Sequence, residues 1–138
     1  MPKQSTLIYR KARLPEEIPY LRAIEVRGYD DVFTGRDYLN LMKHPYQGIR
    51  VVSDGPEVKG FMVWQLSPKG ILINRIAGEG IEKLLKGAVS MARHYETNLV
   101  FTAEPLEHEF LADTKFIDDI ITMYEGGKEA FFIKYLTD

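Results

Sequence analysis

Cysteine is absent from the 138 residues of the sequence. A disulfide framework, a thiolate metal site and a cysteine nucleophile are therefore excluded. The sequence also lacks the run of about 18 consecutive apolar residues that a membrane-spanning helix needs, and the polar residues 1–5 lack the apolar core of a signal peptide. An excess of one charge is missing too, because 18 Lys and Arg residues oppose 20 Asp and Glu residues. We therefore expect neither nucleic acid nor a membrane as a partner.

The apolar content is that of an ordinary globular domain. Hydrophobic residues make up 45% of the chain and aromatic residues 12%, which is enough to fill one core at this length. A chain of this length leaves no room for a second domain. We expect a single soluble domain over residues 1–138.

Hydrophobic periodicity and turn signals divide the chain into short alternating elements. The pattern predicts strands over residues 7–9, 48–53, 58–66, 71–77, 99–103, 116–124 and 129–135. It predicts helices over residues 15–24, 34–42, 80–95 and 105–112, the first beginning at Pro15 and the second capped by Thr34. The strands between residues 48 and 77 form an antiparallel meander, and the following strand, helix and strand require a parallel crossover.

This order, β-α-α-β-β-β-α-β-α-β-β, resembles the GNAT N-acetyltransferase fold over almost the whole chain. The strand pair Val58–Trp64 and Ile71–Ala77 is similar to the family's central "v-G-f" and "i-x-x-i-A" strands. The ending Tyr124–Lys134 is similar to the closing segment of ribosomal-protein alanine acetyltransferases. The expected fold class is α/β, a mixed and mostly antiparallel sheet with one parallel β-α-β crossover.

The resemblance also implies a place for acetyl-CoA. In active members the pantetheine lies between the fourth and fifth strands, and a Q/R-x-x-G-x-G/A loop wraps the pyrophosphate at the start of the next helix. A helix N-terminus suits a diphosphate because its backbone N–H groups are unpaired donors with partial positive charge. The loop falls here on residues 77–82, and the residues implied in cofactor binding are Ile76, Ala77, Gly78, Gly80 and Ile81.

Several residues depart from the family's pattern. Ala77 replaces the expected Gln or Arg, Glu82 replaces the last Gly or Ala, and the V-x-P segment before the loop is missing. Glu79 and Glu82 place two carboxylates in the first turn of the helix, where they oppose a bound diphosphate. Leu111 stands where many members carry the Tyr that protonates the departing thiolate. These departures predict an eroded acetyl-CoA site.

If the protein were an active enzyme, the strand over residues 71–77 would offer a backbone N–H to the thioester oxygen. Asn74 and Arg75 would line the substrate side of the cleft. Glu25 or Asp30 would be the base, and Tyr124 would be the remaining proton donor.

A metal site is not expected. His108 and Glu109, near Glu104 and Glu107, fail the H-E-x-x-H zinc pattern because position 112 is Ala.

Two hypotheses follow. The first is a non-catalytic GNAT-like module that binds no cofactor and acts through a protein partner or a larger assembly. Small GNAT-like proteins with weak CoA motifs occur in phage genomes and particles, so this module would be cytoplasmic or, if phage-encoded, part of a virion. The alternative is an active acetyl-CoA-dependent N-acetyltransferase that acts on a protein N-terminus or a small amine. The sequence leaves the acceptor and the oligomeric state open.

Overall fold

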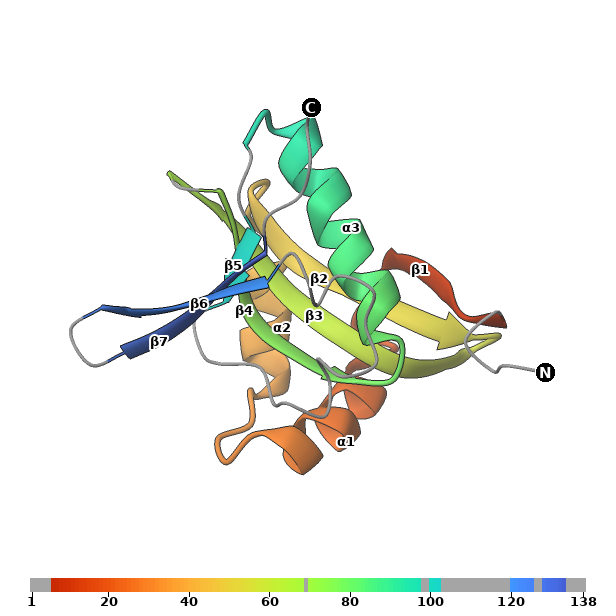
Figure 1. Cartoon of the computed structure of the whole chain (residues 1–138). Coiled ribbons are helices and arrows are strands. Elements are labelled where there is room, and N and C mark those ends of the chain that lie inside the picture. The colour runs from red at the N-terminus through yellow and green to blue at the C-terminus, as the bar shows by residue number, and fades with distance from the viewer. Residues whose placement is uncertain (1–5, 69, 98–99, 103–119, 126–127, 134–138) are drawn as a thin grey trace.

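The computed structural model describes residues 6–68, 70–97, 100–102, 120–125 and 128–133. Within these residues a seven-stranded sheet has the order β1-β2-β3-β4-β5-β7-β6 (Figure 1). Its strands are β1 (Ile8–Lys11), β2 (Gln47–Asp54), β3 (Glu57–Ser67), β4 (Gly70–Gly78), β5 (Val100–Thr102), β6 (Ile120–Glu125) and β7 (Lys128–Ile133). The described helices are α1 (Ile18–Gly28), α2 (Gly35–Leu41) and α3 (Ile81–His94).

The sheet is antiparallel except at one junction. β1, β2, β3 and β4 pair antiparallel in succession, as the turn signals between residues 48 and 77 predict. After α3 the chain returns to pair β5 parallel with β4, and β6 and β7 form a terminal antiparallel pair. The mixed α/β class and the single parallel crossover are therefore confirmed. The helix expected over residues 105–112 lies outside the described residues.

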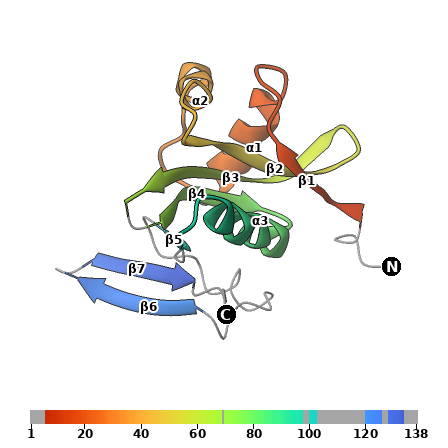
Figure 2. The ribbon, with the colours of Figure 1, turned by 90° about the horizontal axis from the view of Figure 1, so that it is seen from above.

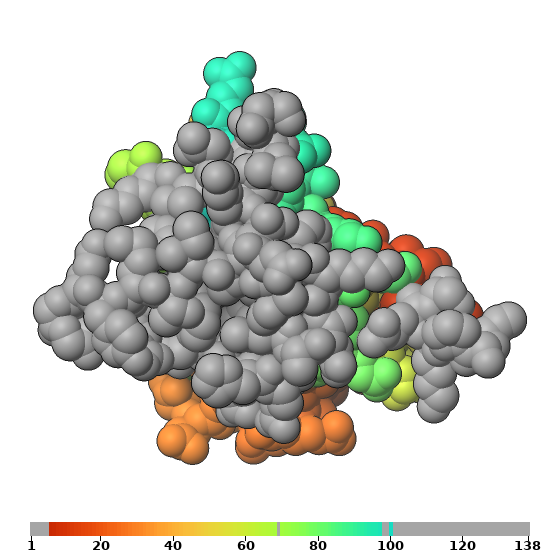
Figure 3. Space-filling view, in the orientation of Figure 1, coloured from red at the N-terminus to blue at the C-terminus, as the bar shows by residue number. Residues whose placement is uncertain are grey.

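The helices cover both faces of β1–β4. Seen from above, α1 and α2 lie on one face and α3 lies on the other (Figure 2). In the space-filling view the orange surface of α1 and α2 forms the lower rim, and the end of α3 forms the upper one (Figure 3). No helix in the described part of the chain is long and apolar enough to cross a membrane.

Each face of the sheet has its own hydrophobic core. The core under α3 joins that helix to Met62, Trp64 and Ile76, and the core under α1 and α2 contains Tyr38 and Phe61. β3 contributes to both because its side chains alternate between the two faces. Trp64 is only 4% exposed and belongs to the core under α3.

The two N-terminal helices begin for different local reasons. Thr34 caps α2 as predicted: its hydroxyl accepts from the Asp37 N–H at 3.1 Å, and the Asp37 carboxylate accepts from the Thr34 N–H at 2.9 Å. The predicted start of α1 at Pro15 is wrong, because this helix begins at Ile18. Glu17 precedes it, and its carboxylate binds Arg10 of β1 at 2.5 Å instead of facing solvent at a helix start. The residue that precedes α1 is thus held to β1 by an ion pair.

Candidate functional site

The first feature of the candidate site is the part of β4 that follows its described pairing with β5. The parallel ladder joins only residues 71–73 of β4 to residues 100–102 of β5. β4 then continues to Gly78, whereas the described part of β5 ends at Thr102. A bulge accompanies this change, because Val63 pairs with Arg75 and Trp64 pairs with Ile73, which leaves Asn74 unmatched on β3. Residues 74–78 continue β4 beyond its described ladder with β5, and the resemblance places pantetheine beside this part of the strand.

The connection from β4 to α3 is short and depends on glycine. Gly78 and Gly80 have φ angles of 93° and 74°, which residues with a side chain rarely adopt. A Cβ on Gly78 would lie 2.4 Å from the Lys59 carbonyl oxygen, so the turn also packs tightly on β3. Gly80 is the N-cap of α3 and supplies no side-chain cap. The expectation that strand runs almost directly into helix is confirmed.

The acidic residues of this turn take different positions. Glu79 is exposed and precedes the N-cap, so it lies outside the first helical turn in which the sequence placed it. Glu82 lies in that turn, and its carboxylate pairs with Lys86 at 3.3 Å, one turn further along α3. The nearby Lys83 donates to the Leu7 carbonyl oxygen at 2.7 Å. Both lysines on the first half of α3 are thus bound to groups of the protein.

Tyr29, the residue that follows α1, contacts the backbone of β4 through its hydroxyl. The Tyr29 hydroxyl accepts from the Ile76 N–H at 3.0 Å and donates to the Ile76 carbonyl oxygen at 3.3 Å. In an antiparallel pair, alternate residues direct these two groups away from the partner strand. Ile76 therefore presents its polar backbone on the side of β4 away from β3, and the hydroxyl satisfies both groups.

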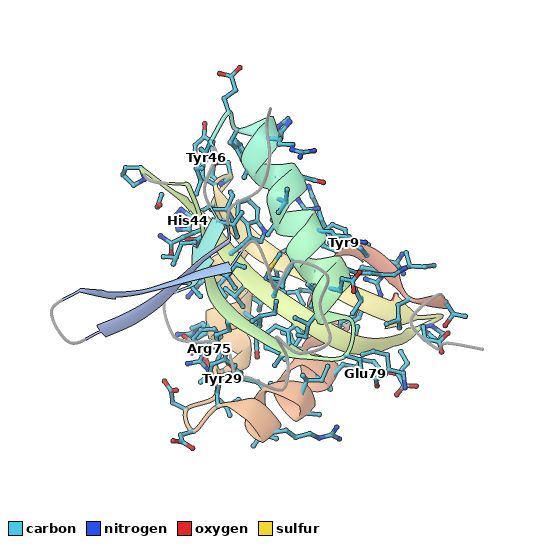
Figure 4. All side chains as sticks on the ribbon, viewed as in Figure 1. Tyr9, Tyr29, His44, Tyr46, Arg75 and Glu79 are labelled. Carbon is cyan, nitrogen blue, oxygen red and sulfur yellow. The ribbon has the colours of Figure 1, made fainter. Side chains whose placement is uncertain are left out.

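A buried charged cluster adjoins this contact, as Figure 4 shows for Arg75 beside Tyr29. Glu25 of α1 has no exposed surface, and its carboxylate accepts from the Arg75 guanidinium, the Tyr38 hydroxyl and, at 2.9 Å, the Phe33 N–H. Arg75 also pairs with the Asp31 carboxylate at 3.0 Å.

Aromatic rings complete the surroundings of Arg75. Its guanidinium carbon lies 4.6 Å from the centroid of the Tyr29 ring and 4.2 Å from that of Phe33. Phe33 in turn meets the Tyr38 ring edge-on at 5.5 Å. Burial, the hydrogen bond to Glu25 and the charge of that carboxylate raise the pKa of Tyr38, so its hydroxyl stays protonated and donates.

The structure thus brings together some of the residues singled out in the sequence. Glu25 and Arg75 are in contact, and Arg75 adjoins Ile76 in β4. Asn74 donates to the Gln65 side chain of β3 at 2.9 Å, and Asp30 is exposed in the connection between α1 and α2. Ala77 and Ile81 are both buried. Tyr124 belongs to β6, and Leu111 lies outside the described residues.

Sequence reasoning missed Tyr29, Phe33 and Tyr38 as members of this cluster. Tyr38 lies within the helix predicted over residues 34–42, and Tyr29 lies between the two predicted helices of residues 15–24 and 34–42. Aromatic residues in the region 29–38, together with an acidic residue at the inner face of the preceding helix, carried a weak signal for a buried polar cluster. Tyr29 and Glu25 nevertheless contact residues of β4 that lie more than forty positions later in the sequence, so these contacts leave no local pattern.

No family model matches the chain, and no curated protein matches its sequence. Solved structures do match. The PaiA N-acetyltransferase of Thermoplasma acidophilum, in complex with coenzyme A, gives a TM-score of 0.72 at 10% identity, covering 94% of this chain and 99% of that one. Ard1 of Thermoplasma volcanium gives 0.70 at 15% identity, covering 92% and 95%.

A third similar structure is the ribosomal-protein-S18-alanine N-acetyltransferase of Escherichia coli, with a TM-score of 0.66 at 8% identity, covering 96% of this chain and 97% of that one. Identities this low establish the fold alone. The chain has the GNAT acetyltransferase fold, which confirms the resemblance found in the sequence.

Proposed function

We propose that this chain is a GNAT-fold protein whose acetyl-CoA cleft no longer accepts the cofactor. It acts by binding a protein partner or by joining a larger assembly, and it transfers no acetyl group. The observation that carries this proposal is the Tyr29 hydroxyl on the backbone of Ile76.

The contact at Ile76 matters because of where it lies. Acetyl transfer on this fold needs backbone groups of β4 for the thioester, and Ile76 lies on the segment that extends past the ladder with β5. Both of its polar groups already have a partner in Tyr29. Displacing two hydrogen bonds costs about 1 kcal/mol each, and each 1.4 kcal/mol lowers affinity about tenfold. The Tyr29 hydroxyl therefore competes with acetyl-CoA for the backbone groups of Ile76.

The turn before α3 adds to that obstacle. Glu79 and Glu82 bring negative charge to the place where a diphosphate would bind. The Glu82 carboxylate is paired with Lys86, so the exposed Glu79 is the carboxylate of this turn that has no ion pair among the described residues. The charge of Glu79 opposes a bound diphosphate.

The contacts of Glu25 favour a structural role over a catalytic one. A general base must reach the proton that it removes with an accessible oxygen. Both carboxylate oxygens of Glu25 accept from donors of the protein, and the residue is fully buried. Asp30 is exposed and remains the freer of the two predicted bases.

One observation favours the alternative, an active N-acetyltransferase on a protein N-terminus or a small amine. Gly80 leaves the first amides of α3 without a side-chain cap, and residues 74–78 of β4 lie beyond the described ladder with β5. These are features that a bound acetyl-CoA would use, with Ala77, Gly78 and Ile81 beside the pyrophosphate. A cofactor able to displace Tyr29 would restore this function.

Calorimetric titration with acetyl-CoA separates the two functions. The wild-type protein is expected to give no binding heat at millimolar acetyl-CoA. The Tyr29→Ala variant frees the Ile76 backbone. Tyr20→Ala is its matched control, because Tyr20 lies on α1, the helix that precedes Tyr29, and is 41% exposed. Weak binding that appears in Tyr29→Ala alone would identify the hydroxyl contact as the obstacle. Micromolar binding by the wild-type protein would refute the proposal.

A further inference from the structure

A recess of about 230 Å³ lies on the α3 side of the sheet, over β1, β2 and β3 and away from Tyr29 and Arg75. Its described walls come from β1, β2 and β3, from the connection between α2 and β2, and from the residue that follows α3. β1 and β2 contribute Lys11, Gly48 and Arg50, the connection between α2 and β2 contributes Met42, and Tyr95 follows the end of α3. His44, labelled in Figure 4, marks the connection that closes one side.

The indole of Trp64 borders this recess. The residue is 4% exposed, and its Nε1 atom is buried without a hydrogen-bond partner among the described residues. A buried N–H without a partner carries a desolvation penalty of about 1 to 3 kcal/mol. The buried donor therefore adds a polar group to the wall of the recess.

Gly48 keeps the space beside that donor open. A Cβ at Gly48 would lie 3.4 Å from Trp64 Nε1 and 3.8 Å from Met42 Sδ. Any larger side chain would therefore cover the indole N–H. The indole thus borders space that the absence of a side chain at position 48 leaves free.

Positive charge surrounds the same space. Arg50 and Lys11 both line the recess, and no carboxylate of the described residues forms an ion pair with either. The Arg50 guanidinium carbon lies 5.9 Å from the centroids of the Tyr9 and Trp64 rings, which hold it in place. The described residues of the lining include no acidic residue. The recess therefore combines the two cations Lys11 and Arg50 with neutral polar and apolar groups.

We propose that this recess binds the carboxylate of a small organic acid or of an acidic side chain, with an apolar group next to the carboxylate. The carboxylate accepts from the planar guanidinium of Arg50 and lies near Lys11, next to the buried indole of Trp64. The apolar group packs against Met42 and the ring of Tyr95, whose centroid lies 6.3 Å from that of Trp64.

The size of the recess favours this ligand class. Pockets for drug-sized ligands measure about 300 to 1,000 Å³, so this one suits a single carboxylate with a small apolar body. The site uses none of the residues of the acetyl-CoA cleft, and it stands whether or not acetyl-CoA binds.

The only tryptophan in the chain makes the test direct. Its single indole N–H cross-peak in a ¹H–¹⁵N spectrum reports on the donor itself. Sodium benzoate, acetate and phosphate are titrated separately at constant ionic strength. Benzoate is expected to shift the peak at millimolar concentration, and acetate is expected to need about tenfold more because it lacks the apolar ring. A peak that stays still at 50 mM benzoate overturns the proposal, as does saturation by phosphate at a lower concentration than by benzoate.

Two variants locate the site. Arg50→Gln removes the charged donor and is expected to weaken benzoate binding about tenfold or more. Gly48→Ala fills the space beside the indole and is expected to abolish the shift while the rest of the spectrum stays dispersed. Arg36→Gln removes the same charge from an exposed position on α2 and is the matched control. Equal weakening by Arg36→Gln and Arg50→Gln overturns the assignment.

A peptide pair identifies the source of the carboxylate. A capped Gly-Glu-Phe-Gly peptide and its Gln counterpart are titrated in the same way. Tighter binding of the Glu peptide than of benzoate supports an acidic side chain of a protein partner, and the reverse order supports a free organic acid. Equal shifts by the Glu and Gln peptides show that the carboxylate is not recognised, and they overturn the proposal.

Discussion

Replacing Glu25 with Gln tests the buried cluster that joins α1 to β4. The carboxylate accepts from three donors: the Arg75 guanidinium, the Tyr38 hydroxyl and the Phe33 N–H. A Gln side chain keeps one acceptor oxygen, but its NH₂ group then faces a donor of the cluster. At the same time Arg75 loses its charged partner Glu25, whose side chain is fully buried. The change keeps the shape of the side chain and removes its charge.

The expected cost can be estimated from the burial of the pair. Removing one partner of a buried ion pair costs about 3 to 5 kcal/mol. Arg75 keeps Asp31, whose side chain is 90% exposed, so part of the charge remains compensated. We therefore expect a loss of about 3 kcal/mol in the free energy of unfolding. With a urea slope of about 1 to 3 kcal/mol per molar, this moves the unfolding midpoint down by about 1 to 3 M.

Urea unfolding followed by the fluorescence of Trp64 measures this shift. Glu16→Gln is the matched control, because Glu16 is exposed and makes no ion pair among the described residues, so its effect is expected within about 0.5 kcal/mol. A double-mutant cycle with Arg75→Met isolates the coupling between the two residues, expected above about 1 kcal/mol. A loss below 1 kcal/mol for Glu25→Gln, or one equal to that of Glu16→Gln, would refute the reasoning.

Two further predictions concern packing and pH. Gly87→Ala adds a Cβ 2.1 Å from Tyr9 Cζ, so it should destabilise the protein by about 1 to 2 kcal/mol despite the better helix propensity of Ala; a gain in melting temperature like that expected for exposed Ser90→Ala would contradict this. Burial opposes ionisation of Glu17, but hydrogen bonds to Arg10 and to a backbone N–H outweigh it and lower its pKa from 4.5. The stability lost in Glu17→Gln, about 2 kcal/mol at pH 7, should therefore shrink as pH falls below 4.5, which urea unfolding at several pH values would show. A pH-independent difference would argue against the ion pair.

Much of the fold followed from local patterns. The meander of β2, β3 and β4 was predicted because glycine and proline punctuate strands of alternating hydrophobicity. The helix over residues 80–95 and the cap at Thr34 were predicted for equally local reasons. The start of α1 was not: the helix begins at Ile18, and Glu17 before it is paired with Arg10 of β1.

The candidate site was likewise predictable only in part from the sequence. The sequence alone placed Gly78, Gly80 and two acidic residues at the junction before the predicted helix of residues 80–95, and its order of elements resembled a known fold. The structure was needed to show that the Tyr29 hydroxyl binds the backbone of Ile76, that Arg75 pairs with Glu25, and that Trp64 Nε1 is buried beside a recess. Dihedral preferences and periodicity act over a few residues, so they leave a trace in the sequence. Contacts between residues 47 or 50 positions apart depend on how the helices pack on the sheet, and no local pattern encodes them.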